Sequence, residues 1–130
     1  MRIVVFVSRL LLGLTFGVFG LNGFLLFMPP PAHIPGNAGA FSGAMMSSHY
    51  VYLTAGAQVL GGVLLLINRY VPLALVVLAA IIANILTFHI TMWQQAIIPF
   101  PVLVTVLWFI VAWPLRTHFA PLFVRKVENQ

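Results

Sequence analysis

The polar side chains that could do chemistry in this sequence stand singly inside long apolar stretches. They carry amide, hydroxyl and imidazole groups, which donate and accept hydrogen bonds. A polar side chain inside an apolar membrane span normally faces a protein interior or a water-filled cavity, because leaving it unpaired is costly. The candidate ligand-binding residues are Asn22, Gln58, Asn84, Thr87 and His89.

Four apolar stretches are long enough to hold these residues inside a membrane. An α-helix needs about 20 apolar residues to cross roughly 30 Å of hydrocarbon. The chain has 130 residues, of which 62% are hydrophobic and 5% charged, whereas soluble domains average about 25% charged residues. We therefore predict an all-α, integral membrane four-helix bundle that forms one transmembrane domain over residues 1–130. Its spans are expected near 10–28, 49–67, 71–93 and 99–115.

The segment between the first two spans is rich in proline and glycine. Residues 28–48 contain four prolines and three glycines, which rule out a continuous helix. Within this segment, residues 38–46 are apolar and small enough for a short interfacial or re-entrant helix. Long loops in compact bundles are often functional, so the 29–48 loop is a candidate lid on the outer side.

The basic residues predict the orientation in the membrane. All six fall near the termini or in the loop between the second and third spans, and the other two loops contain none. Lys and Arg are enriched in cytoplasmic segments, so both termini are expected in the cytoplasm and the Pro/Gly-rich loop outside. These residues are Arg2, Arg9, Arg69, Arg116, Arg125 and Lys126.

Each of the four spans places a polar group in the same band, in the outer half of the membrane. At a rise of about 1.5 Å per residue, Asn22, Gln58 and Asn84 lie about 9, 13 and 12 Å below the outer helix ends. Thr87 lies about 8 Å below its helix end, and Thr105 about 9 Å into the last span. Two interpretations stay open: a pocket roofed by the first loop, or hydrogen bonds between helices that contribute roughly 0.6–2 kcal/mol each.

The third span carries most of these polar groups. Asn84, Thr87 and Thr91 stand at i, i+3 and i+7 and share one stripe. His89 lies about 140° from Asn84 at 100° per residue, so two directions stay open for it: the same cavity, or a neighbouring helix or subunit. His89 is a candidate proton carrier, a candidate metal or porphyrin ligand, or a structural hydrogen-bonding residue.

Several function classes lack the residues they need. The chain has no cysteine, so disulfides, thiol redox centres, iron–sulfur ligation and cysteine-type zinc sites are excluded. His33, His49 and His89 are spaced 16 and 40 residues apart, which is no metal-binding signature, and we predict no metal site. No span contains a carboxylate, which argues against proton pumping by this chain alone. Six scattered cations do not predict a nucleic-acid partner.

Three further residues or groups bear on packing and on the membrane boundary. Gly13, Gly17 and Gly20 fall on one face of the first span, and this spacing allows another helix to approach closely. Arg9 stands just before that span and is expected to snorkel toward lipid phosphates. Trp108 in the last span is expected to pack in the bundle.

The order of these stretches resembles the DoxX-like family of small four-span bacterial membrane proteins. The resemblance covers nearly the whole chain and includes the combination of Gly-x-Asn-Gly, Gly-Gly-x-x-Leu-Leu and Asn-Arg-x-Val-Pro. The matching stretches are RLLLGLTFGVFGLNGFLLFMPPP, VLGGVLLLINRYVPLAL, FHI and WPLRTHFAPLF.

The resemblance implies a multi-pass protein of the bacterial inner membrane that serves a redox assembly. The family takes its name from a subunit of a sulfur-oxidising, quinone-linked oxidoreductase. The resemblance implies at most a non-catalytic or quinone-interacting subunit of an oxidoreductase. The candidate ligand is a quinone or another lipophilic molecule. The candidate partners are membrane lipid, other membrane subunits or a second copy of the chain. Members often carry an acidic residue where this chain has Gln58, so a protonatable group is missing there. The alternatives are an accessory or assembly subunit without enzymatic function and a small dimeric transporter.

Overall fold

The computed structural model describes residues 2–27 and 34–127, and every regular element within these ranges is helical. The prediction of an all-α fold is therefore confirmed for this part of the chain. The α-helices are α1 (Arg2–Leu25), α2 (Gly36–Ser47), α3 (Val51–Ile67), α4 (Val71–Met92), α5 (Phe100–Ala112) and α6 (Arg116–Phe119), and the 3-10 turns are η1 (Gln94–Ala96), η2 (Trp113–Leu115) and η3 (Ala120–Phe123).

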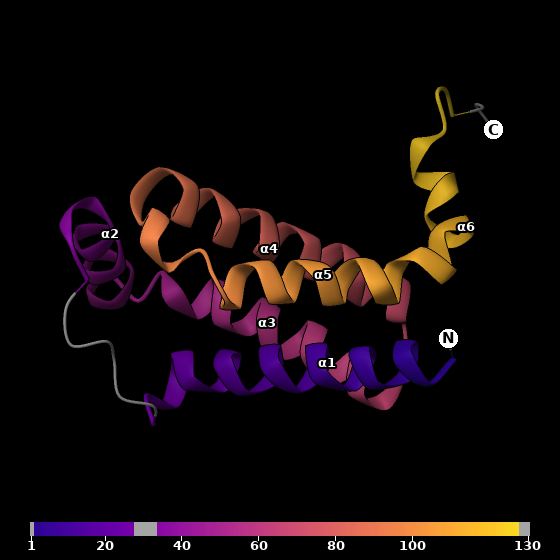
Figure 1. Ribbon diagram of the computed structural model, residues 1–130, viewed down its shortest axis with the longest axis horizontal. Coiled ribbons are helices and arrows are strands. Elements are labelled where there is room, and N and C mark those ends of the chain that lie inside the picture. The colour runs from indigo at the N-terminus through magenta and orange to yellow at the C-terminus, as the bar shows by residue number, and fades with distance from the viewer. Residues whose placement is uncertain (1, 28–33, 128–130) are drawn as a thin grey trace.

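Three helical segments are long and apolar enough to cross a membrane. They are Arg2–Leu25, Val71–Met92 and the combined Phe100–Phe123. A fourth would come from α3 together with α2, which are bent by 85° at the break between them. Figure 1 shows α1, α3, α4 and α5 running alongside one another, with α2 at one end of the bundle and both chain termini at the other.

Some helix ends differ from the predicted boundaries, for local reasons. α1 begins at Arg2, well before residue 10, since the residues that precede the first predicted span are themselves apolar and helical. The short helix expected in the Pro/Gly-rich loop is present as α2, and it begins directly after Pro35, whose backbone is extended. Pro114 follows the end of α5, where the backbone continues as a 3-10 turn, because proline removes a helical hydrogen bond.

A sharp turn joins α3 to α4. Asn68 and Tyr70 adopt left-handed φ angles of 57° and 53°, and Asn is among the residues that tolerate this conformation best. Pro72 then occupies the first turn of α4, where its missing N–H has no helical partner to lose. The turn returns the chain antiparallel to α3 (Figure 1).

Glycines bring α1 and α3 into backbone contact. A Cβ atom added at Gly62 would lie 2.5 Å from the nitrogen of Gly17 and 2.7 Å from the carbonyl oxygen of Gly13. The preceding residue, Gly61, faces the other neighbour, since a Cβ there would lie 2.7 Å from Cγ of Leu78 in α4. The predicted close approach at Gly13 and Gly17 is confirmed, and the two adjacent glycines let α3 contact a helix on each side.

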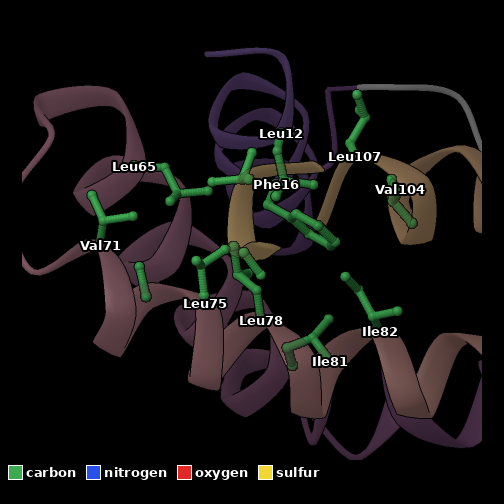
Figure 2. Close-up of a cluster of buried hydrophobic side chains, with 13 residues drawn as sticks. Leu12, Phe16, Leu65, Val71, Leu75, Leu78, Ile81, Ile82, Val104 and Leu107 are labelled. Carbon is green, nitrogen blue, oxygen red and sulfur yellow. The ribbon is translucent and has the colours of Figure 1, made fainter. Parts of the chain in front are cut away.

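The apolar core lies between these four helices (Figure 2), and side chains from all of them meet there. One polar contact crosses the core: Nε1–H of Trp108 in α5 donates to the carbonyl oxygen of Leu75 in α4 at 2.8 Å. Trp108 thus packs in the bundle, as predicted, and also ties α5 to α4. The largest fully buried side chains are Phe16, Leu12, Leu65, Leu75, Leu78, Val104, Val111 and Pro101.

Replacing Gly62 by alanine is expected to lower stability by about 1–3 kcal/mol, because the new methyl group would press on the α1 backbone. Gly17→Ala is the matched control on the facing helix, since a Cβ at Gly17 meets nothing within 4 Å. Thermal unfolding of the purified variants in detergent measures both effects. Equal melting temperatures for the two variants would contradict the close contact.

Trp108→Phe is expected to lower stability by about 0.5–1.5 kcal/mol through loss of the hydrogen bond to Leu75. The aromatic ring is retained, so most of the packing should remain. Thermal unfolding in the same detergent gives the value, and Phe109→Leu serves as a comparison because that ring is exposed. A Trp108→Phe melting temperature equal to that of the unchanged protein would show that the bond contributes nothing.

Candidate functional site

Two adjoining cavities lie where α2 packs against α3 and α4. Their volumes are about 210 Å³ and about 380 Å³. α2 contacts the C-terminal part of α4 through Phe41, and the centroids of the Phe41 and Phe88 rings are 5.6 Å apart. The helix formed by the Pro/Gly-rich loop thus contributes one wall of both cavities. The residues that line both are Phe41, Met45, Thr54, Ile81, Asn84 and Phe88.

Gln58 is, with Ser42, one of two polar residues of the smaller cavity that form no hydrogen bond with another described residue. It comes from the middle of α3 and is half-buried. Its side-chain amide forms no hydrogen bond with any other described residue, and the cavity keeps its polar atoms accessible. An amide carries two N–H donors and one oxygen acceptor. Gln58 can therefore donate to and accept from a molecule in the cavity.

Asn84 lines both cavities from α4 and is partly committed to its own helix. Its Nδ2 donates to the carbonyl oxygen of Ala80 at 3.0 Å. This bond uses a donor and leaves the oxygen Oδ1 as an acceptor. Asn84 is exposed in the isolated chain, so its acceptor can be reached from the open side of the cavities.

His89 lines the smaller cavity, where its ring is held by two contacts. Nδ1 lies 2.8 Å from the carbonyl oxygen of Ile85, and the ring stacks on Trp93 with centroids 6.0 Å apart and planes at 10°. A carbonyl oxygen only accepts hydrogen bonds, so Nδ1 carries the hydrogen. In the neutral ring Nε2 is then the acceptor, positioned by the bond on the other nitrogen.

Of the two directions that the sequence leaves open for His89, the structure has the one toward the cavity lined by Asn84. The angle from the helical wheel still holds, but the cavity is broad. At 100° per residue, the lining residues of α4 fall at about 40° (Phe88), 60° (Ile81), 100° (Ile85) and 140° (His89) from Asn84. One wide face of α4 therefore holds both polar residues with apolar side chains between them.

Thr87 lies on the opposite side of Asn84 and lines the larger cavity together with Thr91. The hydroxyl of Thr91 donates to the carbonyl oxygen of Thr87 at 2.6 Å. The predicted stripe of Asn84, Thr87 and Thr91 is thus one wall of this cavity. Asn84 stands where the two cavities meet.

Two members of the predicted polar layer lie elsewhere. Asn22 of α1 is half-buried and lines neither of these cavities. Thr105 of α5 also lines neither, and its hydroxyl donates to the carbonyl oxygen of Pro101 at 2.8 Å. The structure therefore brings together Gln58, Asn84 and His89, with Thr87 alongside them, but it does not bring in the polar groups of α1 and α5.

Sequence reasoning identified neither Thr54 nor the residues that α2 contributes to the cavities. Thr54 lines both cavities and precedes Gln58 by one helical turn, so the spacing i, i+4 could have revealed it. Phe41, Ser42 and Met45 come from α2. Their positions depend on where α2 folds back onto α4, which no local pattern reports.

The described histidines do not form a metal centre. In residues 2–27 and 34–127 no group of three His, Cys, Asp or Glu side chains could hold a metal ion. His49 packs against the ring of Tyr52, 5.3 Å away between centroids. His33, which the sequence groups with His49 and His89, lies outside the described residues.

Comparisons of the chain with protein-family models, curated proteins and solved structures give no match. The interpretation of the site therefore depends on its geometry and its chemistry.

Proposed function

We propose that this chain is an integral protein of the bacterial inner membrane that binds a lipophilic small molecule with a polar head, such as a quinone, beneath α2. The observation that carries the proposal is the half-buried amide of Gln58, which bonds to no other described residue and lines a cavity with mainly apolar walls. Ligand sites are typically apolar clefts with a few polar groups that set orientation. The larger cavity, at about 380 Å³, falls in the range of about 300–1,000 Å³ typical of such sites.

The polar groups suit the two forms of a quinone. A quinone oxygen accepts a hydrogen bond, which the amide N–H groups of Gln58 can donate. A quinol hydroxyl donates, and Nε2 of His89 and Oδ1 of Asn84 can accept. The aromatic rings of Phe41 and Phe88 line the same space and can pack against a flat ring. The chain would bind and orient the ligand, while a partner subunit of a redox assembly would supply the electrons.

The hydrogen bonds favour a pocket over contacts that hold helices together. The side chains of Asn84, His89, Thr91 and Thr105 each bond to the carbonyl four residues earlier in their own helix. None of these bonds joins two helices. The proposed DoxX-like character of the chain is compatible with such a binding subunit.

The second candidate function is an accessory subunit whose polar face meets another protein. Asn84 and Thr87 are exposed on α4, and polar residues exposed to lipid are costly. A neighbouring subunit or a second copy of this chain would cover them. The ligand experiment below separates the two candidates.

The orientation is tested by labelling single cysteines, which is direct because the chain contains none. Gln95→Cys in η1 and Lys126→Cys near the C-terminus are both at exposed positions, at opposite ends of the bundle. With both termini in the cytoplasm, an impermeant maleimide should label position 95 in intact cells and position 126 only after permeabilisation. The reverse pattern would overturn the orientation, and labelling of both in intact cells would argue against membrane embedding.

The ligand is tested on protein extracted gently from its native membrane and examined by mass spectrometry. A stoichiometric quinone or other lipophilic molecule should be present, and Gln58→Leu should lower its affinity about 2- to 13-fold, as expected for one lost hydrogen bond. Thr105→Val is the matched control, because Thr105 lies outside both cavities.

Titration with a short-chain ubiquinone gives the affinities, followed by quenching of tryptophan fluorescence. Trp93 lies beside His89 and should report occupancy. Equal affinities for Gln58→Leu and Thr105→Val would set the binding site aside. A ligand-free protein that co-purifies with a larger complex, and loses it when Asn84 is changed to leucine, would favour the accessory subunit.

A further inference from the structure

A separate cavity of about 280 Å³ lies at the end of the bundle that holds the chain termini. α1, the turn between α3 and α4, the end of α5 and α6 surround it. Three polar residues line it: Arg9, Asn68 and His118. The rest of its wall consists of valine, proline and leucine side chains. The site described above does not use this cavity.

Arg9 is a half-buried cation without an acidic partner in the described structure. One of its guanidinium N–H groups donates to the carbonyl oxygen of Leu65 in the last turn of α3. The guanidinium also lies 5.4 Å from the centroid of the Phe6 ring. The part of the chain that the structure describes contains no carboxylate, since Glu128, the only acidic residue, lies outside it.

The bond to the end of α3 uses only part of the hydrogen-bonding capacity and charge of Arg9. A guanidinium is permanently charged and carries five N–H donors in a planar fork. The bond to Leu65 uses one of them, and the negative end of the helix dipole compensates the charge only in part. The remaining donors are available to an anion in the cavity.

Asn68 and His118 add further N–H donors to the cavity. Asn68 is held at the turn by its left-handed backbone, with φ of 57°, and its side-chain amide has two N–H donors. The neutral imidazole ring of His118 has one N–H donor. Arg69 and Arg116 lie nearby in the sequence and are exposed, so this end of the molecule attracts anions over a longer range.

We propose that this cavity binds a phosphate group, carried by an anionic phospholipid or free in solution, with Arg9 as its main ligand. The planar fork of arginine matches two phosphate oxygens, and basic cavities between membrane helices are typical sites for anionic lipid head groups. The apolar wall would receive the first carbons of the lipid's acyl chains. This proposal differs from the prediction that Arg9 only snorkels to the membrane surface, because the phosphate would lie in a cavity between three helical segments.

Native mass spectrometry of the full chain in detergent tests the proposal with three probes. They are dioctanoyl phosphatidylglycerol, dioctanoylglycerol (which lacks the phosphate) and inorganic phosphate. The unchanged protein should bind phosphatidylglycerol and not dioctanoylglycerol. Arg9→Gln should weaken that binding about tenfold or more, because hydrogen bonds to charged groups are about twice as strong as neutral ones.

Arg69→Gln is the matched control, because it removes one positive charge from an exposed side chain outside the cavity. Its affinity for phosphatidylglycerol should stay within about twofold of the unchanged protein, as screening by salt weakens exposed charges. Equal loss in Arg9→Gln and Arg69→Gln would overturn the site in favour of a diffuse basic surface. Equal binding of dioctanoylglycerol would overturn it as well.

Inorganic phosphate distinguishes the two sources. Displacement of the lipid by millimolar phosphate would support the site and identify free phosphate as its ligand, whereas no displacement would support a lipid. If Arg9→Gln does not fold, the double variant Asn68→Gly, His118→Phe takes its place, because it removes the side-chain N–H donors of both residues. Glycine keeps the left-handed turn, so unchanged lipid affinity in this folded variant would overturn the proposal.

Discussion

The contact of α3 with helices on both sides is the constraint on which the rest of the structure depends. It is possible only because Gly61 and Gly62 are adjacent, so that one faces α4 and the other faces α1. In a bundle with so few charged residues, close packing of backbones is a main source of helix association. The position of α3 then decides where every polar group on that helix can point.

Gln58 illustrates this dependence. At 100° per residue it lies about 60° from Gly61 and about 40° from Gly62 around α3. It therefore points between the two neighbouring helices, toward the interior of the bundle, and this explains why it is half-buried. The direction of this amide is therefore a consequence of the packing glycines one turn below it.

Periodicity and composition were enough to predict the helices, the short helix in the Pro/Gly-rich loop and the close approach at Gly13 and Gly17. These features follow from neighbours within one or two turns. The composition of the cavities was less predictable, because it depends on how α2 folds back. Asn22 shares the predicted depth of Gln58 but lines neither outer cavity, since depth along a helix says nothing about the direction of a side chain. His89 joins Asn84 only because α4 presents a face about 140° wide.

The two ends of the bundle offer different chemistry for the same structural reason. The helices are held together mainly by small residues and apolar side chains, and Trp108 and Arg9 make the described side-chain hydrogen bonds between helices. Polar groups that are not needed for packing remain available at the ends. Neutral amides and an imidazole lie beneath α2, where they can exchange hydrogen bonds with the polar head of a lipophilic molecule. Arg9 stands at the other end, where its bond to Leu65 leaves most of its donors unused. The two proposed sites, one for a neutral molecule and one for an anion, would therefore lie at opposite ends of a single short bundle.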